Sequence, residues 1–127
     1  MLTWLTANGK YKLKFDLQSR KNGNWYYAEY STFRVLSEAN NYKLQVGGYS
    51  GNAGFDAFGL HNGQQFSTFD RDNDLWSYNC ALIGGGFWWR DCGLCRVNGA
   101  RSHGYFLWWR LPGGSYLQST RMWLQCK

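Results

Sequence analysis

The sequence has little proline, few acidic residues and no long apolar run. Its 127 residues include a single proline, Pro112, and only 8 Asp and Glu against 14 Lys and Arg. Its longest apolar stretches are interrupted by glycine or charge and fall short of the ~18 residues that a membrane-spanning helix needs. We therefore predict no membrane insertion. Residues 1–10 also lack the pattern of a secretion signal, so a secreted protein with this sequence would be a fragment or would have lost its leader.

The distribution of charge argues against nucleic-acid binding, and the placement of the histidines argues against enzymatic activity. The net charge of +6 is spread along the chain without a basic cluster or RNA-binding signature, which is typical of a solvated surface. The two histidines, His61 and His103, stand in no motif that pairs a nucleophile with a base. We therefore predict neither nucleic-acid binding nor enzymatic activity.

Aromatic residues and glycine are abundant instead. Phe, Trp and Tyr make up 20% of the chain, more than the 17% that is charged, so rings can build the core. The 16 glycines indicate many turns. A chain of this length has room for one core of modest size. We predict a single loop-rich domain over residues 1–127.

The first third of the chain has the period of β-strands. Residues 11–17 alternate apolar and charged side chains, Asn22-Gly23 suits a tight hairpin turn, and residues 25–35 are rich in rings and β-prone residues. The alternation returns over residues 42–46. These patterns predict an antiparallel meander. From Gly47 no period is sustained, so we predict irregular structure there and no long amphipathic helix anywhere.

The four cysteines lie in the second half of the chain and permit three pairings. Cys92 and Cys95 form one C-x2-C pair, but no second pair follows. This spacing disfavours tetrahedral zinc and favours disulfide chemistry in an oxidising compartment. The spacing alone does not choose among the three pairings.

An acidic run, Asp70-Arg71-Asp72-Asn73-Asp74, places three of the eight carboxylates within five residues. Alternating carboxylates combined with backbone carbonyls suit Ca²⁺, which takes six to eight oxygen ligands. An EF-hand loop is excluded, because Leu75 and Ala81 stand where that motif needs Gly and Glu. The alternative is a solvated turn that holds no ion.

Residues 42–54, YKLQVGGYSGNAG, resemble the Y-x-L-x-V-G-G-Y-S-G-x-A-G pattern of C-terminal fibrinogen-related domains. Matches continue in the family's order through His61-Asn62-Gly63, Phe66-Ser67-Thr68, the acidic run, Asn79-Cys80-Ala81, Gly86-Phe87-Trp88-Trp89, Cys92 and Asn98-Gly99. Residues 5–9 and 27–30 fit as well. The resemblance fades after Gly99.

The resemblance implies an α+β fold of the fibrinogen C-terminal type, in which a small antiparallel β-sheet is followed by a largely irregular calcium-binding loop region. It pairs Cys80 with Cys92. For Ca²⁺ it implies the carboxylates of Asp72 and Asp74 and the carbonyls of Trp76 and Tyr78, with Asp70 as a neighbouring acid. Because a complete family domain begins well upstream, we expect the domain to be N-terminally incomplete and its sheet to have an unprotected edge.

The ligand region departs from the lectin-like members of the family, such as ficolins and tachylectins. In those members a His follows the second cysteine and helps to form an acetyl pocket, whereas Gly93 follows Cys92 here, as in receptor-binding members of the angiopoietin kind. We expect the ligand site beside the calcium loop, with Gly93 making it roomier. The candidate ligand-binding residues are Asp91, Cys92, Gly93, Tyr105, Trp108 and Trp109.

Cys95 and Cys126 have no counterpart in the family pattern. They bond to each other, link subunits into a homo-oligomer, or stay free. The resemblance as a whole implies a secreted, extracellular, calcium-stabilised recognition module. Lectin-like binding of acetylated or other glycans in innate immunity is the first interpretation, and binding of a protein receptor, of the angiopoietin-like or extracellular-matrix type, is the alternative.

Overall fold

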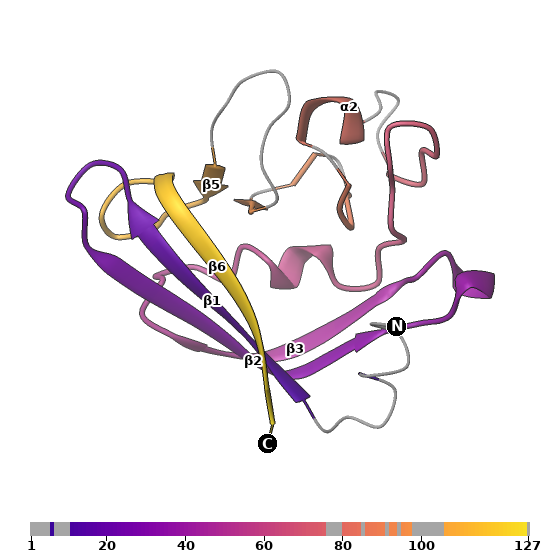
Figure 1. Ribbon diagram of the computed structural model, residues 1–127, viewed down its shortest axis with the longest axis horizontal. Coiled ribbons are helices and arrows are strands. Elements are labelled where there is room, and N and C mark those ends of the chain that lie inside the picture. The colour runs from indigo at the N-terminus through magenta and orange to yellow at the C-terminus, as the bar shows by residue number, and fades with distance from the viewer. Residues whose placement is uncertain are drawn as a thin grey trace.

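The protein is mostly β-strand in the computed structural model, which describes residues 6, 11–75, 80–84, 86–90, 92–93, 95–97 and 106–126 (Figure 1). The strands are β1 (Tyr11–Ser19), β2 (Trp25–Val35), β3 (Leu44–Gly51), β4 (Cys95–Arg96), β5 (Phe106–Trp108) and β6 (Tyr116–Cys126). The helical turns are η1 (Glu38–Asn40), η2 (Gly59–His61) and the four-residue α2 (Ala81–Gly84). No helix among these residues is long and apolar enough to cross a membrane. The helical share implied by an α+β class is therefore smaller than expected.

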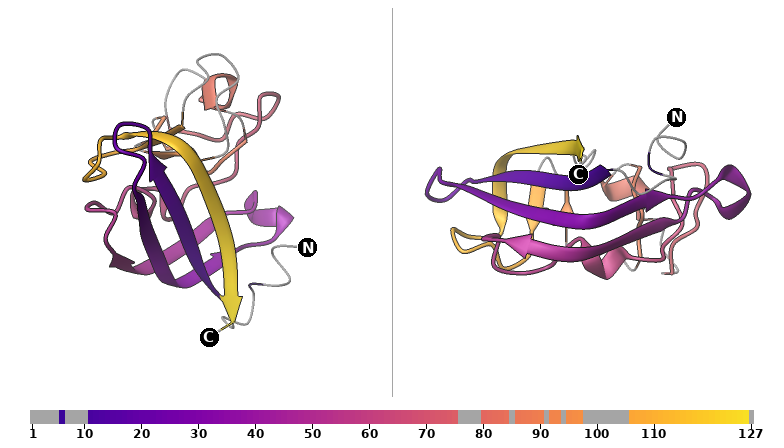
Figure 2. Two further views of the ribbon diagram at one scale, coloured as in Figure 1. Left: turned by 60° about the vertical axis from the view of Figure 1, so that its left-hand side comes forward. Right: turned by 90° about the horizontal axis from the view of Figure 1, so that it is seen from below.

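One antiparallel sheet contains both the first and the last strand of the described residues, β1 and β6 (Figure 2). Its six strands follow the order β3-β2-β1-β6-β5-β4. The predicted meander is confirmed in β1, β2 and β3, while β6, which the sequence analysis did not predict, lies on the other side of β1. Phe15 is thus flanked by Ala28 of β2 and Met122 of β6. The C-terminal strand therefore completes the sheet, which is larger than expected.

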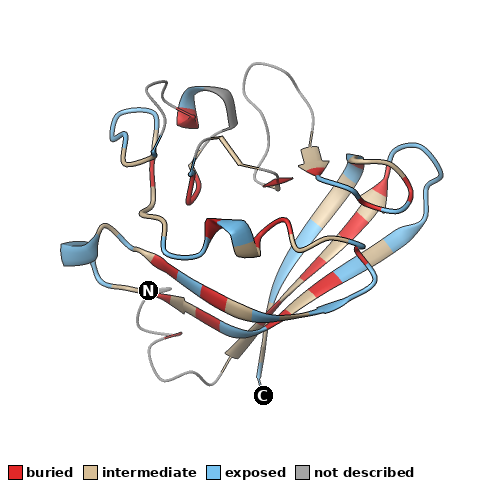
Figure 3. Ribbon diagram, turned by 180° about the vertical axis from the view of Figure 1, so that it is seen from behind, coloured by how far each residue is buried: buried red, intermediate tan, exposed pale blue. Residues whose placement is uncertain are grey.

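Strand β1 shows why the alternating pattern was informative. Leu13, Phe15 and Leu17 are completely buried, and the polar residues between them stay partly exposed on the other face. Figure 3 shows buried positions interspersed with more exposed ones along β2 and β3 as well, whereas Leu117 is the single buried residue of β6. β1, β2 and β3 therefore each present an apolar face to a common core.

Strand β3 continues to Gly51, four residues beyond the point where irregular structure was predicted. Its ladder pairs Tyr49 with Tyr30 and Gly51 with Ala28. Gly48 has φ +69°, and a Cβ there would lie 1.8 Å from Ser31 Oγ of the neighbouring strand. The glycines that weakened the sequence pattern therefore permit a close approach of two strands.

The core lies between the sheet and the irregular segment that crosses it, which carries η2 (Figures 1 and 3). Phe58 of this segment packs at ring-centroid distances of 5.0 Å from Phe15, 5.5 Å from Tyr30 and 5.7 Å from Phe87. Edge-to-face and tilted ring pairs of this kind contribute about 0.5–1.5 kcal/mol each beyond their burial. Aromatic packing thus ties a segment without long ladders to the sheet.

Two cysteines remain unpaired in the structure. Cys95 lies buried in β4 and Cys126 lies exposed at the end of β6, and β5 separates these strands. The alternative of a Cys95–Cys126 bridge is therefore not realised. Burial, and to a lesser degree the Asp56 carboxylate, raises the pKa of the Cys95 thiol, so this thiol stays protonated and unreactive at neutral pH.

Candidate functional site

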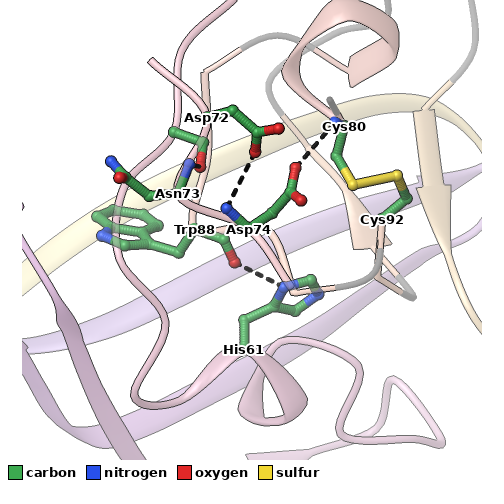
Figure 4. Close-up of a disulfide and its surroundings, with 8 residues drawn as sticks. His61, Asp72, Asn73, Asp74, Cys80, Trp88 and Cys92 are labelled. Atoms are coloured by element: carbon green, nitrogen blue, oxygen red, sulfur yellow. Dashed lines mark hydrogen bonds between the residues drawn. A yellow bond between two sulfur atoms is a disulfide. The ribbon is translucent and has the colours of Figure 1, made fainter. Parts of the chain in front are cut away.

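A disulfide between Cys80 and Cys92 closes the irregular region, as predicted (Figure 4). The two Cα atoms lie 5.1 Å apart and the cysteines are 12 residues apart in the chain. Cys80 directly precedes α2, and Cys92 follows the buried Trp88-Trp89 pair. The bond therefore anchors a segment that has few backbone ladders to the aromatic core.

The acidic run lies on a loop that is held at its base by side-chain hydrogen bonds. Asn73 donates its backbone N–H to Ser67 Oγ at 2.9 Å and its side-chain amide to the Phe66 carbonyl at 2.9 Å. Thr68 and Arg71 exchange two backbone hydrogen bonds of 3.1 Å. Residue 73 thus stands between the two carboxylates proposed for calcium and fixes the backbone that carries them.

Asp72 and Asp74 are linked to each other and to the disulfide (Figure 4). The Asp74 N–H donates to Asp72 Oδ1 at 3.2 Å, and the Cys80 N–H donates to Asp74 Oδ2 at 2.9 Å. The Asp74 carboxylate therefore ties the acidic loop to the residue that begins the disulfide-closed loop.

The described residues supply only part of the expected calcium site. They contain no group of three or more His, Cys, Asp or Glu side chains placed to hold a metal ion. The expected set has two carboxylates, and its remaining donors, the carbonyls of Trp76 and Tyr78, lie outside the described residues. The chemistry of this donor set, oxygen atoms alone, suits Ca²⁺.

His61 is a core residue beneath the disulfide. Its side chain is fully buried, its Nδ1 lies 2.8 Å from the Trp88 carbonyl oxygen, and its ring lies 5.2 Å from Phe87 and 6.2 Å from Trp89. The Trp88 indole N–H donates in turn to the Tyr42 carbonyl at 2.8 Å. This network joins the turn at residues 61–63 to the segment that leads to Cys92.

Gly93 is packed against that histidine, which corrects the expectation of a roomier pocket. Gly93 has φ +55°, and a Cβ there would lie 1.9 Å from His61 Cε1 and 2.4 Å from Nε2. Cys92 also has a positive φ of 62°, a conformation that costs a non-glycine residue roughly 1–3 kcal/mol. A side chain at residue 93 would therefore collide with the core. Asp91 lies outside the described residues.

The aromatic residues proposed for the ligand site differ in their exposure to solvent. Trp108 is fully buried, and its indole N–H donates to the Phe55 carbonyl at 2.9 Å, so its ring belongs to the core and the expectation that it contacts a ligand is wrong. Trp109, its neighbour, is 42% exposed. Tyr105 lies outside the described residues. Among the described candidates, Trp109 is therefore the ring that can meet a ligand.

Comparison with known proteins assigns the family. Residues 1–124 match the model of the C-terminal globular domain of the fibrinogen beta and gamma chains. The chain belongs to this family. The fibrinogen-like globe domain of human ANGPTL6 has the same fold, with a TM-score of 0.88 and 33% sequence identity, and the match covers 99% of this chain and 61% of that one.

Several curated relatives are similar to this fibrinogen-like chain. It is 44% identical over 100 residues to fibrinogen-like protein A of Apostichopus parvimensis, across 76% of this chain and 35% of that protein. It is 48% identical over 86 residues to human angiopoietin-related protein 2, across 68% and 17%, and 38% identical over 112 residues to human ficolin-3, across 83% and 37%. The chain thus spans little more than a third of these relatives at most.

The relatives include secreted extracellular proteins, and members of the family are recognition modules that are not enzymes. The family therefore gives the fold and the broad class of function. It leaves open which kind of ligand this chain binds, because ficolin-3 and angiopoietin-related protein 2 resemble it over much of the same region.

Proposed function

We propose that this chain is a secreted, extracellular recognition module that binds acetylated or other glycans in innate immunity. The observation that carries this proposal is the anchoring of the irregular region at both ends of its acidic loop, by Asn73 at one end and by the Asp74–Cys80 contact at the other. A loop that is already anchored loses less conformational entropy when a ligand binds. Its backbone N–H groups are therefore held in place to donate hydrogen bonds to a small polar group.

Calcium is the proposed stabiliser of this region. Asp72 and Asp74 would supply carboxylate oxygens and Trp76 and Tyr78 would supply carbonyl oxygens, while Asp70 would remain a neighbour. When bound, Ca²⁺ offsets the repulsion between nearby carboxylates and fixes the loop that carries them. The contact between Asp74 and the Cys80 N–H offers a route by which this order reaches the disulfide.

We expect calcium to raise the melting temperature of the chain. An ion that binds only the folded state stabilises it by about 2.7 kcal/mol at 100 times its dissociation constant. Replacing Asp72 and Asp74 together by Asn should abolish the calcium-dependent shift, whatever the melting temperature in EDTA. Differential scanning calorimetry with and without calcium measures both quantities.

The matched control for calcium is Asp70→Asn. Asp70 lies two residues from Asp72 and its Oδ1 accepts a 2.7 Å hydrogen bond from Thr68 Oγ1, so this variant removes one negative charge from the same loop, where the double variant removes two. It should keep the calcium-dependent shift. An equal loss of the shift in Asp70→Asn and in the double variant would mean that general charge, and not a site at Asp72 and Asp74, causes the response.

Glycan binding is tested by comparing two exposed tryptophans. Trp109 is one of the candidate ligand-binding residues and is 42% exposed, while Trp25 on β2 is 44% exposed on the outer side of the sheet. We expect Trp109→Ala to weaken binding of N-acetylglucosamine at least about tenfold, a loss of about 1.4 kcal/mol, and Trp25→Ala to leave it unchanged. Calorimetry measures both variants after a glycan array, with and without EDTA, has identified binding.

A protein receptor is the second candidate, and exposed apolar side chains favour it. Phe69 is 58% exposed, Leu75 is 67% exposed and Leu82 is 46% exposed, and all three lie in or near the acidic loop and α2. Exposed apolar side chains of this kind are typical of surfaces that contact another protein. A chain that binds no glycan on the array, with or without calcium, would favour this candidate.

A further inference from the structure

The turn between β1 and β2 and the loop between β5 and β6 lie side by side, at the opposite end of β2 from η1 (Figure 1). Ser19 Oγ donates a buried hydrogen bond of 2.6 Å to the Gly113 carbonyl, which joins residues that are 94 positions apart in the sequence. Next to it, the Arg20 N–H donates to the Tyr116 carbonyl at 3.0 Å. The two segments therefore form one surface that the order of residues in the sequence does not show.

Three cationic side chains belong to this surface. Arg20 and Lys21 lie in the turn, Arg110 lies in the loop, and all three residues are exposed. The Lys21 side chain lies against the loop, because its Cβ and Cδ are 3.5 Å from the position that a Cβ on Gly114 would take. We call Arg20, Lys21 and Arg110 the basic end. Charges that are scattered along the sequence are thus gathered in the folded chain.

An aromatic ring supports each of the two arginines. The Arg20 guanidinium lies 5.7 Å from the centre of the Tyr116 ring, and the Arg110 guanidinium lies 5.6 Å from the centre of the Phe55 ring. Within the described part of the chain neither guanidinium forms an ion pair or a hydrogen bond. A guanidinium that is held over a ring loses less conformational freedom when it binds an anion, and its N–H groups can all donate to that anion.

The basic end has no carboxylate partner. Residues 17–28 and 92–127, which contain the turn and the loop, include no Asp or Glu. The acid next to Phe55 is Asp56, and its carboxylate is directed to the core, where Oδ1 accepts a 2.6 Å hydrogen bond from the Tyr30 hydroxyl. The three positive charges of the basic end are therefore not neutralised by the surrounding residues.

The backbone holds Arg110 in a fixed place. Its φ of +59° lies in the left-handed region, which is unfavourable for a residue with a Cβ. Such a conformation persists where the surrounding contacts impose it, and it is frequent at binding sites. Here the Arg110 N–H donates to Ser115 Oγ at 3.1 Å, and the Gly114 N–H donates to the Leu111 carbonyl at 2.9 Å. The loop thus presents Arg110 from a defined backbone position.

We propose that the basic end binds sulfated glycans through their sulfate groups. Each arginine offers a planar fork of N–H donors, which suits two oxygens of a tetrahedral anion, and Lys21 adds a point charge. Single-stranded nucleic acids fit less well, because they need uncovered rings on which bases stack, whereas arginines cover the Tyr116 and Phe55 rings. No residue of the acidic loop takes part, so this site is separate from the proposed calcium-dependent one.

The first test is isothermal titration calorimetry with a heparin octasaccharide in EDTA, which removes any calcium-dependent glycan binding elsewhere on the chain. We expect the natural chain to bind the octasaccharide, and its affinity to fall as salt is added, because salt screens exposed charges. The same octasaccharide without its sulfate groups should not bind. Equal binding of the two forms, or no binding of the sulfated form, would overturn the proposal.

The second test compares two double variants of equal charge. Arg20→Gln with Arg110→Gln should weaken heparin binding at least about tenfold, with unchanged circular dichroism. Lys43→Gln with Arg90→Gln is the control, because Lys43 directly precedes β3 and the Arg90 carbonyl accepts from the Leu75 N–H beside the acidic loop. The control should bind heparin as the natural chain does. An equal loss in both double variants would assign binding to net charge and overturn the site.

Two further measurements test the role of the guanidinium groups and the class of ligand. Arg20→Lys with Arg110→Lys keeps the charge but removes the planar forks, so it should bind heparin several-fold more weakly than the natural chain. Short duplex DNA should displace bound heparin poorly. Unchanged affinity of the lysine variant would overturn recognition by arginine forks, and displacement by DNA as efficient as by heparin would overturn sulfated glycans as the ligand class.

Discussion

Replacing Gly93 by alanine should lower the free energy of unfolding by about 2–5 kcal/mol. Two costs add: the left-handed backbone at φ +55° costs a residue with a Cβ roughly 1–2 kcal/mol, and the collision with the buried His61 ring adds about 1–3 kcal/mol. Urea unfolding followed by tryptophan fluorescence measures the change. Gly93→His should be more damaging still, because the larger side chain meets the same ring.

Gly63→Ala separates the two costs. Gly63 also has a positive φ, +83°, but nothing lies within 4 Å of the position where its Cβ would stand. This variant should therefore lose only about 1–2 kcal/mol, the cost of the backbone conformation. If Gly93→Ala destabilises the chain no more than Gly63→Ala does, His61 does not pack against Gly93 in the way that the structure indicates.

The sequence predicted strands where one face alternates cleanly and missed them where it does not. β1 was identified because its apolar residues return every second position, and β2 because it is rich in rings and β-prone residues. β6 was missed because it carries a register shift opposite Gln18 and Ser19, and because Met122 on its core side remains half exposed. Leu117 is the single buried residue of β6, so this strand shows no alternation of buried and exposed side chains that a sequence pattern could reveal.

In the candidate site, too, some features could be predicted from the sequence and others could not. The Cys80–Cys92 bond and the place of the acidic run followed from the resemblance to a family. The packing of Gly93 on His61 did not, because it joins residues 32 positions apart through contacts that no local pattern encodes. The same holds for Trp108 and Trp109: both are large rings, and the pairing of Trp108 with Cys95 of β4 decides which of the two enters the core.

Removing the disulfide by replacing Cys80 and Cys92 with serine should lower the free energy of unfolding by about 3 kcal/mol, the chain-entropy value for a loop of this span. The closed loop is short, because the two cysteines are 12 positions apart in the chain. Urea unfolding of the double variant measures the loss. Cys126→Ser is the matched control, because it removes an exposed free thiol and should leave the stability of the monomer unchanged.

The same double variant tests whether the disulfide orders the acidic loop. The Cys80 N–H donates to Asp74 Oδ2, and serine at residue 80 keeps this donor but loses the anchor that positions it. We therefore expect the backbone amide of residue 80 to exchange its hydrogen faster, and the proposed calcium response to weaken, because more of the loop must be ordered when the ion binds. Exchange measured by mass spectrometry, together with the calcium-dependent melting shift, checks both effects. If the exchange at residue 80 and the calcium response both match those of the natural chain, the disulfide stabilises the fold without ordering the loop that carries Asp72 and Asp74.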